Sequence, residues 1–218
     1  MIAAARTPQV RQSNLALVLD QLRRRGSSSR SELVAATGLT RSAIAGLVGE
    51  LETLGLVVET APARDGRPGR PSPVVQVDDR CAVALAIEIF VDEIGAAFVA
   101  LDGSVVASAR VARPRARVAA AETVADVAEL VGRLDAELRD ASTPGTRRRL
   151  VGCGVSVPGL VRELDGVVVA APNLGWIDVA LADSIASVLR LGVPVTVGND
   201  ADLGALAESR FGAGIGSD

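Results

Sequence analysis

The sequence predicts an α/β chain of two domains, a small helical module with a short hairpin and then a mixed sheet covered by helices. Two observations support this prediction. Apolar residues in the first part of the chain recur at helical spacing, whereas from Cys81 onward they gather in strand-length runs that alternate with helical patterns. The predicted boundary separates residues 1–78 from residues 79–218.

Residues 29–54 predict two helices joined by a short turn. Ser29 and Glu32 have the spacing of a capping box, which starts a helix by satisfying unpaired backbone donors. Gly38 permits the left-handed residue that ends this helix, and Thr40 can cap the next one. An apolar stripe follows at i, i+3, i+4, i+7 and i+10: Ile44, Leu47, Val48, Leu51 and Leu54. A similar apolar series predicts an earlier helix: Leu15, Val18, Leu19 and Leu22.

The other side of the second helix carries small or polar residues near its start: Arg41, Ser42, Ala45, Gly46 and Gly49. Two helices joined by a Gly-containing turn form a helix-turn-helix, whose second helix enters the major groove of double-stranded DNA. We expect Arg41 and Ser42 to face base edges beside Ala45, with Thr40 on the DNA backbone. A small helical module for protein contacts is the alternative.

A predicted hairpin follows the helix pair. Residues 56–59 and 74–77 have the composition of short strands, and residues 64–71 between them are rich in Gly and Pro and carry three arginines. A hairpin in this place is the wing of a winged helix, and arginines on a narrow loop suit the minor groove of DNA. We therefore expect Arg67 and Arg70, each next to a proline, in the minor groove. A disordered linker with solvated charges is the alternative.

The charge of the 218-residue chain is unevenly distributed around a net value of −3. Residues 1–80 hold 11 arginines and 8 acidic residues, whereas residues 81–218 hold 12 arginines and 18 acidic residues. A mildly basic head on an acidic body is typical of a DNA-reading module joined to a domain with another task. Lys, His and Tyr are absent, which excludes a histidine base, a histidine metal ligand and a lysine nucleophile.

The two cysteines, Cys81 and Cys153, lie far apart, each within an apolar run. They form no C-x-x-C pair, so we expect buried free thiols and no metal site. No apolar run approaches the ~18 residues needed to cross a bilayer, and the N-terminus lacks the core of a signal peptide. We expect a cytoplasmic protein without a membrane partner.

The predicted second domain begins with three strands at residues 81–90, 94–101 and 104–111, with a hairpin signal at Asp102-Gly103. Further strands are predicted at residues 150–157, 167–170 and 193–197. Helices are predicted at residues 119–140, 178–191 and 201–209. Antiparallel strands followed by alternating helices and strands indicate a mixed sheet covered by helices.

Three motifs stand out in this domain: Gly-Cys-Gly-Val-Ser-Val-Pro-Gly at 152–159, Ala-Pro-Asn-Leu-Gly-Trp at 171–176, and Val-Gly-Asn-Asp-Ala at 197–201 with Glu208 following. Together they resemble the ROK family, which comprises sugar-responsive repressors and sugar kinases. The helix pair and the Gly66-Arg67-Pro68 wing are similar to the repressor branch of this family. The resemblance implies an actin-like, ribonuclease-H-like fold and a repressor of carbohydrate genes. A homodimer is expected because a single winged helix rarely supplies enough affinity.

The sequence departs from the family in two places. Kinases of the family have an Asp-x-Gly-Gly-Thr loop around the ATP phosphates, whereas residues 86–90 are Ala-Ile-Glu-Ile-Phe, without a glycine for close approach. Family members also continue into a second lobe with a sugar motif, a zinc site and an adenosine pocket. We therefore expect residues 79–218 to be a truncated domain, its N-terminal lobe alone, with no enzyme activity, catalytic residue, cofactor or metal. A sugar kinase with a regulatory head and a non-functional fragment are the alternatives.

The resemblance also implies a sugar-effector site formed by Asn199 and Asp200 with Asn173 and Gly159. We expect weak sugar binding, because only one wall of the pocket would be present. Structural roles are the alternative for each position. Asn199 and Asp200 can cap the following helix, Gly159 can belong to a simple turn, and Trp176 beside Asn173 can belong to the core.

Overall fold

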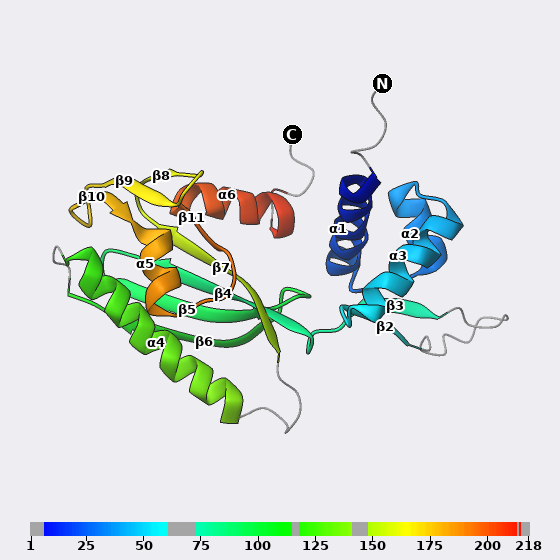
Figure 1. Cartoon of the computed structure of the whole chain (residues 1–218), viewed down its shortest axis with the longest axis horizontal. Coiled ribbons are helices and arrows are strands. Elements are labelled where there is room, and N and C mark those ends of the chain that lie inside the picture. The colour runs from blue at the N-terminus through cyan, green and yellow to red at the C-terminus, as the bar shows by residue number, and fades with distance from the viewer. Residues whose placement is uncertain (1–6, 61–72, 115–117, 141–147, 213, 215–218) are drawn as a thin grey trace. The chain divides into compact units, whose positions relative to one another are not determined.

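The computed structural model describes most of the chain (Figure 1). The described residues are 7–60, 73–114, 118–140, 148–212 and 214. No helix among them is long and apolar enough to cross a membrane. The α/β fold class expected from the sequence is confirmed.

The chain folds into two compact units. The N-terminal unit comprises Met1–Cys81 together with Leu101–Gly103, and the C-terminal unit comprises Ala82–Ala100 and Ser104–Asp218. Each unit has its own hydrophobic core. Each can therefore bury apolar surface without the other.

The N-terminal unit combines three helices with a small antiparallel sheet in its described residues. Its elements are α1 (Thr7–Arg25), β1 (Ser27–Ser29), α2 (Arg30–Thr37), α3 (Arg41–Thr53), β2 (Val57–Thr60) and β3 (Val74–Val77). The strand order is β1-β3-β2, so β3 pairs with both of its neighbours. Strand β1 was not expected, because its three serines show no apolar alternation.

The core of this unit confirms the predicted apolar stripe of α3 with one exception. Ile44, Leu47, Val48 and Leu51 are buried with side chains of α1, α2 and the sheet. Leu54 was expected to continue the stripe, but it is 59% exposed. The reason is that α3 ends at the preceding residue, so Leu54 is a C-cap turned away from the buried side.

The C-terminal unit is built on a five-stranded mixed sheet. Its elements are β4 (Ala82–Ile89), β5 (Glu93–Ala100), β6 (Val105–Ala112), α4 (Ala120–Asp140), β7 (Arg149–Val157), β8 (Leu160–Arg162), β9 (Val167–Ala171), β10 (Trp176–Ala180), α5 (Leu181–Val188), β11 (Val195–Asn199) and α6 (Asp200–Phe211). The order β11-β7-β4-β5-β6 is parallel from β11 to β4 and antiparallel from β4 to β6. Strands β10, β9 and β8 form a second, antiparallel sheet.

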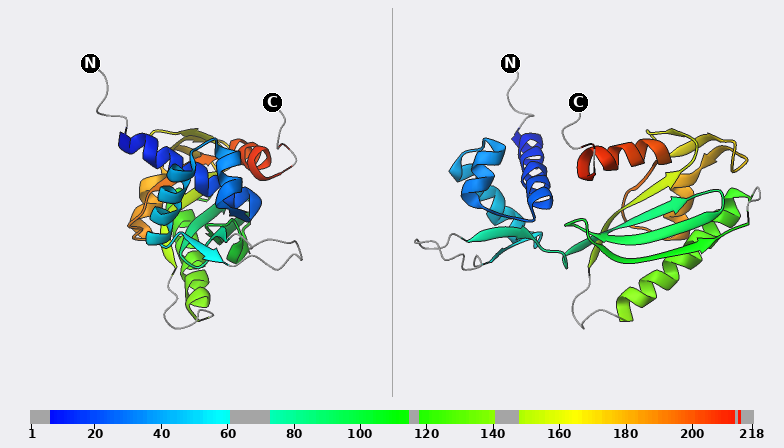
Figure 2. Two further views of the ribbon diagram at one scale, coloured as in Figure 1. Left: turned by 90° about the vertical axis from the view of Figure 1, so that its right-hand side faces the viewer. Right: turned by 180° about the vertical axis from the view of Figure 1, so that it is seen from behind.

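Helices α4 and α5 lie side by side on one face of the five-stranded sheet (Figures 1 and 2). In β4 the burial alternates along the strand, with Val83, Leu85, Ile87 and Ile89 buried. These side chains form one core with the apolar sides of α4 and α5. Alternation of this kind is expected of a sheet whose two faces differ in burial.

The predicted helix at residues 178–191 is wrong at both ends. Its first residues belong to β10, where Val179 pairs with Val168 and Ala180 with Val167. The helix α5 then begins at Leu181, without a side-chain cap, and ends at Val188. Asp178, the first residue of the predicted helix, lies within the strand with a φ of 50°. Strand β8 was also missed, and β11 begins and ends two residues later than predicted.

The thiol prediction is only partly correct. Neither cysteine forms a disulfide, and Cys153 is buried, but Cys81 is only half-buried. Burial raises the pKa of the Cys153 thiol to about 11, so this thiol is protonated at neutral pH. A buried, protonated thiol is a poor nucleophile and a poor metal ligand.

Candidate nucleic-acid interface and effector site

The turn between α2 and α3 fixes the position of the candidate recognition helix. The capping box of α2 is present, with the Ser29 N–H donating to Glu32 Oε2 at 2.7 Å and the Glu32 N–H donating to Ser29 Oγ at 3.2 Å. Gly38 ends α2 with a φ of 70°, and its N–H donates to the Val34 carbonyl. These local signals, predicted from the sequence, are confirmed.

Helix α3 begins with a side-chain cap and is tied to α1 by an ion pair. The hydroxyl of Thr40 accepts a hydrogen bond from the Ala43 N–H at 3.2 Å and lies 3.1 Å from the Ser42 hydroxyl. Arg11 Nε donates to Glu50 Oε2 at 2.8 Å, which links the start of α1 to the last turns of α3. The first turn of α3 has no acidic residue, so the positive end of the helix dipole is not neutralised there.

The outer side of α3 is exposed and carries little bulk. Thr40, Arg41, Ser42 and Ala45 are all exposed, and Arg41 forms no ion pair with any described residue. One turn further, glycines leave this side without side chains: Gly46 and Gly49. The sequence-predicted major-groove residues therefore share one accessible side of one helix.

The predicted wing is only partly within the described residues. Its strands β2 and β3 pair antiparallel, with Thr60 opposite Val74 at the end towards the loop. Arg67 and Arg70 lie outside the described residues, so their minor-groove role stays a prediction. Near the loop end of the hairpin, Arg30 Nε donates to Glu59 Oε1 at 2.7 Å and ties the start of α2 to β2.

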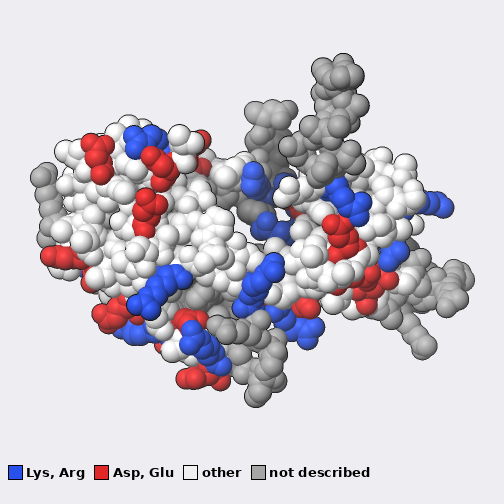
Figure 3. Space-filling model, in the orientation of Figure 1, with Lys and Arg blue, Asp and Glu red and all other residues white. Residues whose placement is uncertain are grey.

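Charge on the N-terminal unit is mixed. On the face shown in Figure 3, basic and acidic side chains lie interspersed over this unit. This fits the small excess of arginine in residues 1–80. DNA binding by this unit would therefore depend on individual placed contacts more than on a broad electrostatic patch.

Two of the predicted effector residues lie next to each other. Asn199 Nδ2 donates to the Gly159 carbonyl at 2.8 Å, which joins the end of β11 to the turn after β7. The Asn199 Oδ1 accepts from the Ala201 N–H at 2.9 Å and from the Asp202 N–H at 3.1 Å. The capping role is thus present at Asn199, and one N–H of its amide remains available for a ligand.

Asp200 and Asn173 are placed differently from this pair. Asp200 is half-buried in the first turn of α6, where its Oδ1 accepts from the Ala201 N–H at 2.9 Å. Asn173 is exposed in the turn between β9 and β10. Among the described residues no hydrogen bond joins Asn173 to Asn199 or Gly159.

Gly159 is required by close packing. A Cβ at this position would lie 2.7 Å from the Ala170 carbonyl oxygen and 2.8 Å from Ala171 Cβ. Both distances are shorter than real Cβ atoms tolerate, so the turn needs a glycine here whether or not a sugar binds.

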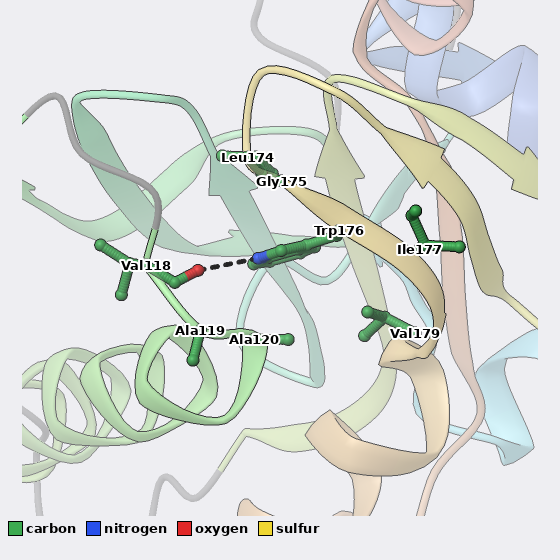
Figure 4. Close-up of a pocket in the computed structure, with 8 residues that line it drawn as sticks. All are labelled: Val118, Ala119, Ala120, Leu174, Gly175, Trp176, Ile177 and Val179. Atoms are coloured by element: carbon green, nitrogen blue, oxygen red, sulfur yellow. Dashed lines mark hydrogen bonds between the residues drawn. The ribbon is translucent and has the colours of Figure 1, made fainter.

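Trp176 belongs to the core, as its structural alternative predicted. Its side chain is 4% exposed, and its Nε1 donates to the Val118 carbonyl at 2.9 Å (Figure 4). A shallow hollow of about 360 Å³ beside it is lined by apolar side chains and backbone: Val118, Ala119, Ala120, Leu174, Gly175, Trp176, Ile177 and Val179. This lining lacks the polar side chains that recognise sugar hydroxyls. The Val118 carbonyl was missed in the sequence, although a buried indole N–H needs an acceptor.

Glu88, in the segment that the resemblance places at the kinase phosphate loop, belongs to an ion-pair network. Arg110 of β6 donates to Glu88 at 2.6 Å and to Glu93 at 2.5 Å. These bonds and charges raise the pKa of Arg110. Gly95 lies between Glu88 and Arg110 in the sheet register, and a Cβ there would be 3.3 Å from Glu88 Oε2. With Arg110 the two carboxylates keep one net negative charge, which is unfavourable for a nucleotide phosphate.

Each of the two units matches the model of a known protein family. A model of the ROK family matches residues 84–218, and a model of the MarR family matches residues 16–68. A putative xylose repressor of Caldicellulosiruptor sp. (strain Rt8B.4) is 28% identical over 203 residues, which are 93% of this chain and 49% of the repressor. The xylose repressor of Bacillus subtilis (strain 168) is 27% identical over 205 residues, covering 94% and 50%.

A solved structure shows the fold. The crystal structure of a ROK family transcriptional regulator, a homolog of the E. coli MLC protein, aligns with a TM-score of 0.70 at 23% identity. The alignment covers 93% of this chain and 49% of that one. This chain spans about half the length of the curated relatives that it matches.

Proposed function

Because this chain belongs to the ROK family, we propose that it is a sequence-specific DNA-binding transcriptional regulator, a repressor of carbohydrate genes. The proposal is carried by the exposed side of α3, which has small or polar residues near the helix start. This helix belongs to a helix-turn-helix in which both α2 and α3 have side-chain N-caps. The MarR-family match over residues 16–68 and the xylose repressors among the relatives support it.

In this proposal α3 enters the major groove with its N-terminal turn foremost. Arg41 and Ser42 read base edges, and Ala45 contacts a thymine methyl group, while Thr40 contacts the DNA backbone. A second copy of the chain binds the other half of a two-fold symmetric operator, because one winged helix supplies too few contacts. A repressor has to be in the same compartment as the DNA that it binds. The predicted cytoplasmic location is therefore part of this proposal.

The test is fluorescence anisotropy with labelled DNA from the region upstream of the chain's own gene, compared with a scrambled duplex over a salt series. We expect tight binding to the upstream duplex and weak binding to the scrambled one, with an affinity that falls as salt increases. Equally weak binding to both duplexes would contradict the proposal.

The wing is tested by replacing Arg67 and Arg70 together with alanine. Loss of two cations from the minor groove should weaken binding and reduce the salt slope by roughly one for each arginine. The control removes Arg133 and Arg139 from α4, which belongs to the C-terminal unit, and so changes the net charge equally. If the double wing variant binds as tightly as the control, the wing assignment is wrong.

The proposal assigns no catalysis to the chain. The kinases of the family bind nucleotide phosphates through glycines, whereas this chain has Glu88 in the corresponding segment, paired with Arg110. A phosphate would have to displace this ion pair and approach a second carboxylate, Glu93.

The effector site remains part of the proposal. Asn199, Asp200, Asn173 and Gly159 are proposed to contact a sugar, with xylose the first to test because it is named in the relatives. Weak binding is expected, since the Asn199 amide already makes three hydrogen bonds within the chain. Isothermal titration calorimetry measures the affinity for xylose of the unsubstituted chain and of the Asp200→Asn variant. Tight binding that the substitution leaves unchanged would contradict the assignment.

A further inference from the structure

Strand β6 is an edge of the five-stranded sheet that differs from the other sheet edges. It has eight residues, whereas the other described edge strands, β1, β2, β8, β10 and β11, have three to five. Among the described residues no strand pairs with its outer side. Natural sheets usually keep free edges short or protect them with charges, prolines or bulges, because an open edge can pair with another chain.

The sequence of β6 gives this edge little protection. It reads Val-Val-Ala-Ser-Ala-Arg-Val-Ala, with no proline, no acidic residue and one positive charge. That charge, on Arg110, is held over the sheet by ion pairs with Glu88 of β4 and Glu93 of β5. A register shift near Val99 marks a bulge at the start of β6, so the regular pairing covers residues 107–112. This regular part is an open and nearly uncharged edge.

The pairing with β5 shows which backbone groups of β6 face outward. The Arg113 N–H donates to the Asp92 carbonyl at 2.7 Å, so this residue directs its backbone groups towards the side of β5. In antiparallel pairing the direction alternates from one residue to the next. Ser108, Arg110 and Ala112 therefore direct their N–H and C=O groups to the open side, and all three residues are exposed.

We propose that β6 pairs antiparallel with β6 of a second copy of this chain, which joins the two sheets and forms the homodimer. The choice of a second copy rests on the proposed function, which needs two winged helices on one operator. Antiparallel pairing of identical strands obeys a two-fold axis. It also closes at two copies, because the opposite edge of the sheet is a different strand, β11.

The side chains and charges along β6 suit a two-fold axis at Ala109. In this register Ser108 lies opposite Arg110 of the second copy, and their outward backbone groups can exchange hydrogen bonds. The Ser108 hydroxyl can accept a further hydrogen bond from that guanidinium. On the axis two alanines meet, and no like charges stand directly opposite each other, which would be destabilising. The edge is therefore complementary to itself.

The experiment measures the molar mass of the full chain by sedimentation equilibrium over the micromolar range. Two variants change the edge. Ser108→Pro removes an outward N–H without removing a hydrogen bond to β5, and Ser108→Lys places a lysine opposite Arg110 of the second copy. The matched control is Thr196→Lys, which adds the same charge at an exposed position of the other edge strand, β11. Thermal unfolding checks that each variant is folded.

We expect the unsubstituted chain and Thr196→Lys to have twice the chain mass of 22.3 kDa. Both Ser108 variants should dissociate at concentrations at least about tenfold higher, because each dimer loses two backbone hydrogen bonds or gains two repulsive pairs. Hydrogen exchange of the unsubstituted chain locates the interface without any substitution. Amides of β6 should exchange at least about tenfold more slowly at the highest concentration than at the lowest, whereas those of β11 should not change.

Three results would overturn the inference. They are a monomer at every concentration, a dimer that both folded Ser108 variants leave intact, and a dimer in which the exchange of β6 amides does not depend on concentration. If the Ser108 variants unfold, the exchange measurement decides alone. None of these readouts involves DNA, so the proposed function is judged separately by anisotropy. A β6 dimer that binds upstream and scrambled duplexes equally weakly would support the interface and contradict the proposed function.

Discussion

Helices α3 and α6 begin alike but are held very differently. Both start with a polar side chain that accepts hydrogen bonds from the first turn, Thr40 in α3 and Asn199 in α6. They have 13 and 12 residues. Helix α3 then buries four apolar side chains in one core, whereas residues 201–210 of α6 are all exposed, including Leu206 at 44%.

The difference separates what starts a helix from what stabilises it. A cap supplies about 1 kcal/mol, which is not enough to hold a 12-residue helix in water. The larger contribution comes from burying an apolar side. We therefore expect α3 to be as stable as the N-terminal unit itself, and α6 to open far more easily than the sheet from which it extends.

The largest predicted effect tests this contrast with two leucines. Leu47→Ala in α3 should lower the free energy of unfolding by about 2–5 kcal/mol, because Leu47 is 4% exposed in a packed core. Leu206→Ala in α6 should change it by less than about 0.5 kcal/mol. Urea unfolding followed by circular dichroism measures both. Equal losses would mean that α6 is packed in solution as firmly as α3.

An effect of intermediate size is expected at the caps. Thr40→Ala should lower the free energy of unfolding of the N-terminal unit by about 1 kcal/mol. Asn199→Ala should lower the free energy of opening of the first turn of α6 by a similar amount, which is measured as faster hydrogen exchange there. Asn199→Asp is the informative control, because it keeps the accepting oxygens but loses the amide that donates to Gly159. If Asn199→Asp exchanges as fast as Asn199→Ala, the bond to Gly159 matters more than the cap.

The smallest predicted effect is a pH-dependent change in stability at the capping box of α2, in which Ser29 and Glu32 each accept a hydrogen bond from the other's backbone. In α2 the hydrogen bond from the Ser29 N–H, with the Ser29 side chain next, holds the pKa of Glu32 below its ordinary value of 4.5. A lowered folded-state pKa stabilises the fold above the unfolded-state value, and this contribution is lost as pH falls through the folded-state value. Glu32→Gln should therefore be slightly less stable at pH 7, and the difference should shrink as pH falls below 4.5 and vanish once Glu32 is protonated in the folded state. A constant difference over this range would contradict the assignment.

Local signals made much of the N-terminal unit predictable. Ser29, Glu32, Gly38 and Thr40 each act through backbone groups only a few residues away, so the sequence alone was enough to place α2 and α3. Strand β1 was not predictable in this way. Its residues Ser27–Ser29 have no apolar pattern and become a strand only by pairing with β3.

Long-range contacts explain what the sequence could not reveal in the C-terminal unit. The strand character of Val179 comes from pairing with Val168, and the hydrogen bond between Asn199 and Gly159 spans 40 positions. The capping role of Asn199 was predictable because its partners are adjacent.

The single tryptophan has a practical consequence for studying the two units separately. The sequence contains one tryptophan and no tyrosine, and Trp176 lies in the core of the C-terminal unit with its indole bonded to Val118. Tryptophan fluorescence therefore does not report on the helix-turn-helix. An emission shift during denaturation would follow only the ROK domain, so comparing it with the far-ultraviolet dichroism signal resolves the unfolding of each unit in one sample, without a label.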